Sequence, residues 1–127
     1  MRFFFDNNLP PRLARALNAL ADPEHSVVHL KDRFAGNTPD QVWLPQLGTE
    51  ADWVIVSGDL RIRKNPHELS AWKAAKHTTF FLKNAWMALE FWDQAQKMVK
   101  CFPELVRQAE RAPRGAQFQL GVNGRID

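Results

Sequence analysis

The sequence predicts one α/β domain: a mainly parallel sheet of four to five strands with helices packed on its faces. Three observations lead to this prediction. Short apolar runs of the length of buried strands alternate with segments of helical periodicity. The 127 residues are enough to bury one substantial core. The composition, with 45% hydrophobic and 24% charged residues, is that of an ordinary globular protein.

The first strand is expected at residues 2–5, three of which are Phe. The prolines at 10 and 11 favour the start of a helix, because the missing amide donor of proline costs little there. This helix has one face of Leu and Ala residues and is expected to stop at residues 22–23, Asp-Pro. A second strand is expected at residues 26–30.

A second helix is expected from residue 38 to about residue 47. It opens with Thr-Pro-Asp-Gln at residues 38–41, which has the form of a capping box with proline at the first helical position. Residues 53–57 follow as the most apolar strand, and therefore the most central one. Residues 65–68, Asn-Pro-His-Glu, repeat the cap-plus-proline pattern and start a third helix towards Lys76.

A fourth strand is expected at residues 78–82, followed by a long amphipathic helix in which Pro103 marks a break or a second start. Its apolar stripe is expected to pack in the core, unless an exposed part contacts a partner or a second copy. The stripe consists of Ala85, Leu89, Trp92, Ala95, Val99 and Phe102. Residues 112–127, rich in Pro, Gly, Asn and Gln, are expected to follow a domain of residues 1–111 as a tail, either flexible or carrying a short edge strand at 118–120.

Charge, cysteine content and hydropathy limit the kinds of partner and the cellular location that we expect for this protein. The net charge of +3 is compatible with nucleic-acid binding but does not by itself indicate it, because phosphate recognition needs clustered charge. Cys101 is the only cysteine, so it is expected to pack as a small apolar side chain. No run reaches membrane-spanning length and no signal peptide is visible, so we expect a cytoplasmic protein with no membrane partner.

Three aspartates stand where parallel-sheet proteins bind ligands. Asp6 and Asp59 each follow an apolar strand, and Asp40 opens the helix expected between them. Ligands bind outside the carboxyl ends of such strands, so Asp6 and Asp59 meet there if their strands are neighbours. Clustered carboxylates repel one another unless protons or a cation neutralise them. The pattern therefore predicts a site for a divalent metal, with oxygen ligands of the kind that Mg²⁺ prefers.

Each acid also has a purely structural interpretation. Asp6 and Asp59 would be turn formers, since Asp hydrogen-bonds its own backbone, and Asp40 would interact with the helix dipole. The three together, at matching positions of one fold, favour a shared site. Glu68 is a further candidate metal ligand, although at the third helical position after Asn65 it also fits a capping-box partner.

A basic loop directly follows the third aspartate and contains Arg61, Arg63 and Lys64. Such a run is either a solvated loop or a surface that contacts RNA phosphates without reading their sequence. Arg12 and Arg15, near the start of the first helix, would extend the same RNA-binding patch.

Taken in order, these segments resemble the PIN-like domains. Residues 3–14 are similar to the opening of that family, in which a strand delivers an acid and an Asn-Leu-Pro stretch starts the first helix. Residues 38–40 resemble the segment that bears the second acid, and residues 54–59 resemble the strand that ends in Thr/Ser-x-Asp. The resemblance covers roughly residues 1–85 and is closest to the compact PIN-like toxins of bacterial toxin–antitoxin pairs. It implies a PIN-like three-layer sandwich.

The resemblance also implies a metal-dependent ribonuclease with Asp6, Asp40 and Asp59 as its catalytic acids. These acids hold one or two Mg²⁺ or Mn²⁺ ions that activate water for attack on an RNA phosphodiester, and a cognate antitoxin protein covers the site or its entrance. Many relatives carry a further acid two residues beyond the third, where this chain has Arg61. Asn8 is a candidate neutral oxygen ligand.

Two other functions stay open at this point. A PIN-like fold that binds RNA without cutting it would explain Arg61 in place of an acid. A receiver-like phosphoacceptor domain would also gather acids at the carboxyl ends of strands and place a lysine after a later strand, as Lys83 is placed here. The receiver is less well supported, because Asp6 is followed by Asn7 and Asn8 rather than by a second acid.

Overall fold

The computed structural model describes residues 1–50, 52–58, 70, 72 and 74–127. In chain order the elements are β1 (Arg2–Phe5), α1 (Pro11–Ala21), β2 (Ser26–His29), α2 (Leu30–Arg33), α3 (Asp40–Gly48), β3 (Trp53–Ser57), β4 (Thr78–Leu82), the 3₁₀ helix η2 (Asn84–Ala88), α5 (Phe91–Arg111) and β5 (Gln117–Leu120). Strands and helices alternate, which confirms the predicted α/β class.

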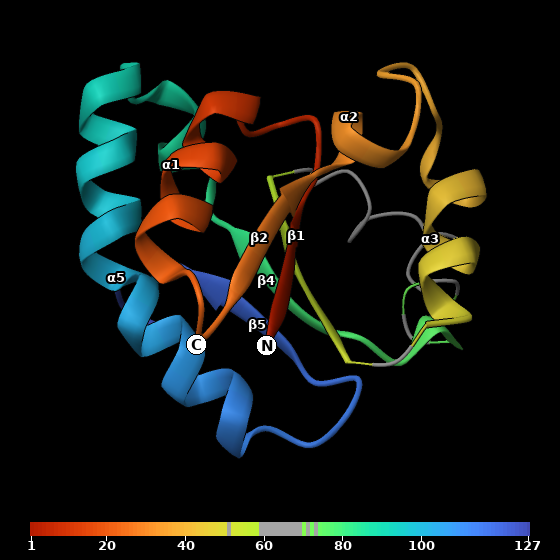
Figure 1. Ribbon diagram of the computed structural model, residues 1–127. Helices are drawn as coiled ribbons and strands as arrows, with labels where there is room; N and C mark the ends of the chain where they lie inside the picture. Colours follow the sequence, from red (N-terminus) through yellow and green to blue (C-terminus); the bar gives the residue numbers. More distant parts are fainter. Residues whose placement is uncertain (51, 59–69, 71, 73) are drawn as a thin grey trace.

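The five strands form one parallel sheet in the order β2-β1-β3-β4-β5. The chain runs outward from β1 to β2 and then returns to the other side of β1 to form β3. The direction of growth therefore reverses between β1 and β3, and ligands bind outside the carboxyl ends of the strands at such a switch point. In Figure 1 this edge of the sheet is the upper one.

Helices cover both faces of the sheet, as Figure 1 shows: α1 and α5 lie on one face, α2 and α3 on the other. Side chains of a strand alternate between faces, so Phe3 and Phe5 join the cluster under α1 and α5, and Phe4 joins the cluster under α3. The three rings are fully buried. A strand covered on both faces can be apolar throughout, which explains the Phe run at the start of the chain.

The second strand is one residue shorter than expected, because a short helix that the sequence did not reveal begins directly after it. The Nδ1 atom of His29 accepts a hydrogen bond from the Lys31 N–H at 3.0 Å, and a carboxylate oxygen of Asp32 accepts one from the His29 N–H at 2.8 Å. These paired bonds satisfy backbone donors at the start of α2.

The capping box expected at residues 38–41 is wrong. The helix α3 starts at Asp40 with Pro39 as its N-cap, and no side chain makes a capping hydrogen bond there. Proline at the N-cap has no side-chain acceptor, and Thr38, which has one, lies one position before the N-cap. The helix expected to run towards Lys76 is present at residues 70, 72, 74 and 75, while its predicted start at residues 65–68 lies outside the described residues.

The long C-terminal helix differs from the prediction in two ways. Residues 84–88 are a separate 3₁₀ helix, so the stripe counted from Ala85 has the wrong phase, and Trp92 is 76% exposed. The helix α5 also runs through Pro103 without a break. A proline inside a helix costs about 3 kcal/mol. Burial of the side chains around it, Phe102, Leu105 and Val106, offsets that cost.

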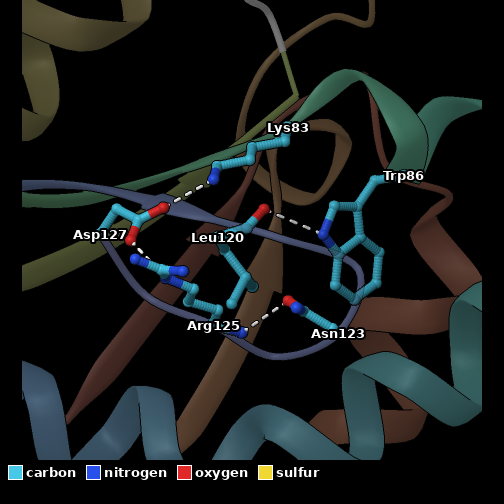
Figure 2. Close-up of polar contacts among 6 residues, drawn as sticks. All are labelled: Lys83, Trp86, Leu120, Asn123, Arg125 and Asp127. Carbon is cyan, nitrogen blue, oxygen red and sulfur yellow. Dashed lines mark hydrogen bonds and ion pairs between the residues drawn. The ribbon is translucent and has the colours of Figure 1, made fainter.

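The end of the described chain covers the outer edge of β5. Gln119 and Asp127 exchange backbone hydrogen bonds of 3.0 and 2.9 Å, and Leu120 forms an antiparallel bridge with Ile126. Figure 2 shows the polar contacts around this turn: Lys83 with Asp127 (2.6 Å), Arg125 with Asp127 (2.8 Å), the Arg125 N–H with Asn123 (3.0 Å) and the Trp86 indole with the Leu120 carbonyl (3.0 Å). The expected edge strand is therefore present; the division at residue 112 stays a prediction.

Candidate active site

Asp6 follows β1 directly at the switch point and is only 4% exposed to solvent. One carboxylate oxygen accepts a hydrogen bond from the Asn8 N–H at 3.0 Å. The other accepts bonds from the Ser57 hydroxyl at 2.5 Å and from the Asn8 side-chain amide at 3.5 Å. The Asp6 N–H donates to the Val56 carbonyl at 3.3 Å. Asp6 is thus attached to the carboxyl end of β3, the strand that precedes Asp59.

Burial raises the pKa of Asp6 from 3.8 to about 6. The hydrogen bonds from the Ser57 hydroxyl and the Asn8 N–H oppose this effect, and the negative charge of Asp40 adds to it. A buried carboxylate whose charge is unfavourable in the folded protein marks a functional-site candidate, because a bound cation would favour the charged form.

Asp40 is the first residue of α3 and is half-buried. Its charge contributes to the raised pKa of Asp6, so the fold places these two predicted acids, 34 residues apart in sequence, within electrostatic range of each other. The Asn7 side-chain amide donates a hydrogen bond to the Gly36 carbonyl, which ties the turn after β1 to the loop that leads into α3. This contact holds the loop before α3 near the turn that follows Asp6.

Gly58 allows β3 to end close against the turn after β1. A Cβ atom on Gly58 would lie 2.8 Å from the Asn8 Cβ and 3.0 Å from both the Sδ and the Cε of Met87. Contacts this short are not tolerated without movement of the neighbouring chain. Neither Ser57 nor Gly58 was predicted from the sequence to be a site residue. The signal was present: small residues between an apolar strand and an aspartate permit a close approach.

His29 fixes the other side of the same turn. Its imidazole is fully buried, with Nε2 2.7 Å from the Leu9 carbonyl and Nδ1 accepting from the Lys31 N–H. These partners assign the proton to Nε2. Burial lowers the pKa of His29, which keeps the ring neutral. His29 is a structural support at the end of β2 that was not predicted from the sequence.

Most of the other predicted site residues lie outside the part of the chain that the structure describes. These are Asp59, Arg61, Arg63, Lys64 and Glu68. Arg12 is exposed at the start of α1, with its guanidinium carbon 3.5 Å from the ring centroid of Phe91. Within the described part of the chain, no group of three or more His, Cys, Asp or Glu residues is arranged to hold a metal ion.

The described acids nevertheless suit a hard cation. Mg²⁺ and Mn²⁺ prefer carboxylate and carbonyl oxygens, and Mg²⁺ is commonly held by one or two carboxylates together with waters. The carboxylate of Asp6 accepts hydrogen bonds from Ser57 and from the N–H and side-chain amide of Asn8, so a bound cation would share its oxygens with these donors. Asp6 and Asp40 are two of the three acids that the sequence pointed to.

Two hollows in the described surface lie away from this edge. One, of about 570 Å³, lies between the later turns of α1 and α5 and is lined mainly by apolar residues such as Leu20, Val99 and Phe102. The other, of about 390 Å³, lies near the amino ends of β3 and β4, around Asp52 and Thr78. Neither contains the acids of the carboxyl edge.

The fold and the site define an α/β protein with a buried carboxylate, whose pKa is raised by burial, at the switch point of a parallel sheet. A family model described as "PIN like domain" matches residues 1–84. The chain therefore belongs to the PIN-like domain family, which confirms the resemblance found in the sequence. Members of this family are generally nucleases and typically use divalent metals. Neither the curated proteins nor the solved structures gave a match. Among the described residues, no helix is long and apolar enough to cross a membrane.

Proposed function

We propose that this protein is a metal-dependent endoribonuclease. The observation that carries the proposal is the buried carboxylate of Asp6, which lies beside Asp40 at the switch point of a PIN-like sheet. Two acids held together at this place repel each other unless a cation intervenes. A fold that keeps them there gains a site for a divalent ion at the cost of stability without the ion.

In this proposal Asp6, Asp40 and Asp59 hold Mg²⁺ or Mn²⁺, and Glu68 is an additional ligand. When bound, the ion supplies an activated water and neutralises charge on the phosphodiester. The chain's own residues position these acids: the Ser57 hydroxyl and the Asn8 N–H hold the carboxylate of Asp6 in place.

The RNA strand would lie along the basic side of the site. Arg61, Arg63 and Lys64 would contact its phosphates, with Arg12 at the periphery. Contacts of this kind bind RNA without reading its sequence, so they anchor the substrate rather than select it.

We infer further that the protein is the toxin of a bacterial toxin–antitoxin pair and acts in the cytoplasm. The support is the resemblance of residues 1–85 to compact PIN-like toxins. The partner would be an antitoxin protein that covers the acids of the carboxyl edge, and a homodimer is a further assembly to test.

Two observations favour other functions: an RNA-binding module without cleavage activity and a receiver domain. Arg61 in place of an acid favours a PIN-like module that binds RNA without cleaving it. The strand order 2-1-3-4-5 is also that of receiver domains. Against a receiver, the ammonium of Lys83 is already paired, since it lies 2.6 Å from an Asp127 carboxylate oxygen.

The deciding experiment is cleavage of a mixed RNA pool with Mg²⁺ or Mn²⁺, beside an EDTA control. Asp6→Asn, Asp40→Asn and Asp59→Asn are each expected to abolish cleavage while staying folded. Asp52→Asn is the matched control, because Asp52 is exposed near the amino end of β3 and its φ of 66° is one that Asn also adopts. Metal-independent RNA binding with no cleavage would favour the binding module, and uptake of phosphate from acetyl phosphate would favour the receiver.

A further inference from the structure

Trp92 is the large apolar residue that the fold leaves most open to water among the described residues. It is 76% exposed near the first turn of α5, although the sequence predicted it in the core stripe. One exposed apolar side chain is ordinary in a folded protein. Its neighbours and its place on the molecule make Trp92 informative.

Trp92 belongs to a surface that also contains Phe91 and Arg12, which we call the aromatic shelf. The rings of Phe91 and Trp92 meet edge to face, with centroids 5.3 Å apart. The guanidinium carbon of Arg12 lies 3.5 Å from the Phe91 ring centroid, close enough for a cation–π contact. No ion pair joins Arg12 to a carboxylate in the described part of the chain, so its charge is available to a ligand.

The aromatic shelf lies at the same edge of the sheet as the acids. Both α1 and α5 begin at this edge, the upper one in Figure 1. Arg12 follows Asp6 by only six residues. Met87, five residues before Trp92, lies near Gly58 at the end of β3: a Cβ atom on Gly58 would be 3.0 Å from the Met87 Sδ. The shelf and the acids therefore share the carboxyl edge of the sheet.

The charges around the shelf indicate which part of a nucleic acid it would contact. Glu90 and Asp93 are exposed on either side of Trp92, and they would repel a phosphate placed over the indole. Arg12 and Arg15 are exposed on α1 and would attract one. A strand that follows this pattern places its phosphates along α1 and turns a base towards Trp92.

We propose that the aromatic shelf binds an unpaired base of the RNA strand, next to the phosphodiester that lies at the acids. The proposal rests on the proposed function and adds to it a contact for a base, made by Trp92 of α5 outside the acids. Bases of a duplex are stacked on one another and present no free face to Trp92. Because every base has a π-face, the shelf adds affinity without selecting a sequence.

The test is binding of a fluorescein-labelled single-stranded RNA, followed by anisotropy in EDTA so that no cleavage occurs. Stacking of one base on an aromatic ring is worth about 1–3 kcal/mol, so Trp92→Ala should raise the Kd about fivefold or more. Trp92→Phe keeps a ring and should stay within about twofold of the wild type. Leu20→Ala is the matched control: Leu20 is 67% exposed on a later turn of α1 and should leave the Kd unchanged.

A second RNA separates base stacking from contacts with phosphate. The same oligonucleotide made with abasic positions should bind the wild type more weakly, and Trp92→Ala should weaken it no further. A duplex of the same sequence should bind Trp92→Ala and the wild type equally. Equal binding of intact and abasic RNA by the wild type would overturn the proposal.

The shelf and the nuclease fail in different ways. If Trp92→Ala binds single-stranded RNA like the wild type while cleavage still needs metal and Asp6, the shelf is overturned and the nuclease stands. If the wild type binds no RNA in EDTA, the shelf is overturned, and the nuclease is overturned only if cleavage with Mg²⁺ or Mn²⁺ is also absent. Unchanged RNA binding together with a change from dimer to monomer in light scattering would assign Trp92 to a contact between copies, which also overturns the proposal.

Discussion

Asp6 is a carboxylate whose ionisation works against folding. Burial raises its pKa from 3.8 to about 6, so the folded protein holds the proton more tightly than the unfolded chain does. Between about pH 4 and pH 6 the folded state therefore carries more protons than the unfolded state, and the free energy of unfolding falls as the pH rises through this range. Above about pH 6 the whole cost is present.

Asp6→Asn should stabilise the metal-free protein at pH 7.5 and abolish cleavage. The two pKa values of Asp6 correspond to a gain of up to about 3 kcal/mol in the free energy of unfolding. The gain should disappear near pH 3.5, where the wild-type carboxyl is protonated in both states. Urea denaturation in EDTA at the two pH values measures it, with Asp52→Asn as the exposed control. A variant that is less stable than the wild type at pH 7.5 would contradict this account.

At the scale of residues, sequence reasoning found the acids but not their partners. Asp6 and Asp40 were recognisable because an acid after a buried strand or at a helix start has a fixed place in a parallel sheet. The hydrogen bond from Ser57 to Asp6 joins positions 51 residues apart. It depends on the register between β1 and β3, which local sequence does not encode.

Among the elements, the end of β3 has the tightest packing requirement in the site. Gly58→Ala should push the turn at Asn8 away from β3, reduce cleavage at least tenfold, and cost about 1–3 kcal/mol of stability, as overpacking typically does. Chemical denaturation and RNA cleavage measure the two effects.

Gly48→Ala is the matched control for that substitution. A Cβ there would lie 3.6 Å from the Ala75 Cα, an ordinary contact, and alanine is favoured over glycine in a helix by up to about 1 kcal/mol. Equal behaviour of the two variants would show that the close approach at Gly58 has no consequence.

The elements were predictable where a pattern repeats and not where one side chain decides. Apolar runs identified the strands β1, β3 and β4, because these are buried on both faces. The short helix α2 was missed, since its start depends on hydrogen bonds of the His29 ring. The predicted apolar face of α5 was wrong, because residues 84–88 form the separate 3₁₀ helix η2 and the helical periodicity does not continue from Ala85 into α5.

For the whole molecule, the segment after β5 protects the edge of the sheet. Removing residues 121–127 would expose backbone groups of β5 that now pair with Asp127, and such an edge pairs readily with other chains. We expect this truncation to lower the free energy of unfolding and to increase aggregation, measured by denaturation and light scattering.

Lys83→Ala is the control for the truncation. Both side chains of the Lys83–Asp127 pair are about 40% exposed, and a pair of this kind contributes no more than about 1 kcal/mol. If the single substitution were as damaging as the truncation, the ion pair rather than the covered edge would hold this end of the sheet.

The overall architecture was predictable because it follows from alternation. Strand–helix alternation implies a parallel sheet with crossovers, and the switch point between β1 and β3 places the acids at one edge. The family match over residues 1–84 agrees with this reading. The final covering of β5 by residues 121–127 was not foreseen, since it relies on backbone pairing rather than on a side-chain pattern.

The central claim is that the acids of the carboxyl edge form a divalent-cation site, and Mn²⁺ titration followed by calorimetry tests it most directly. At pH 7.5, above the pKa of Asp6, we predict that the wild type and Asp52→Asn bind Mn²⁺ with equal affinity. Asp6→Asn should weaken binding at least tenfold, because it removes a charged ligand from the site. Equal Mn²⁺ affinity in Asp6→Asn and the wild type, or no binding by the wild type, would contradict the account.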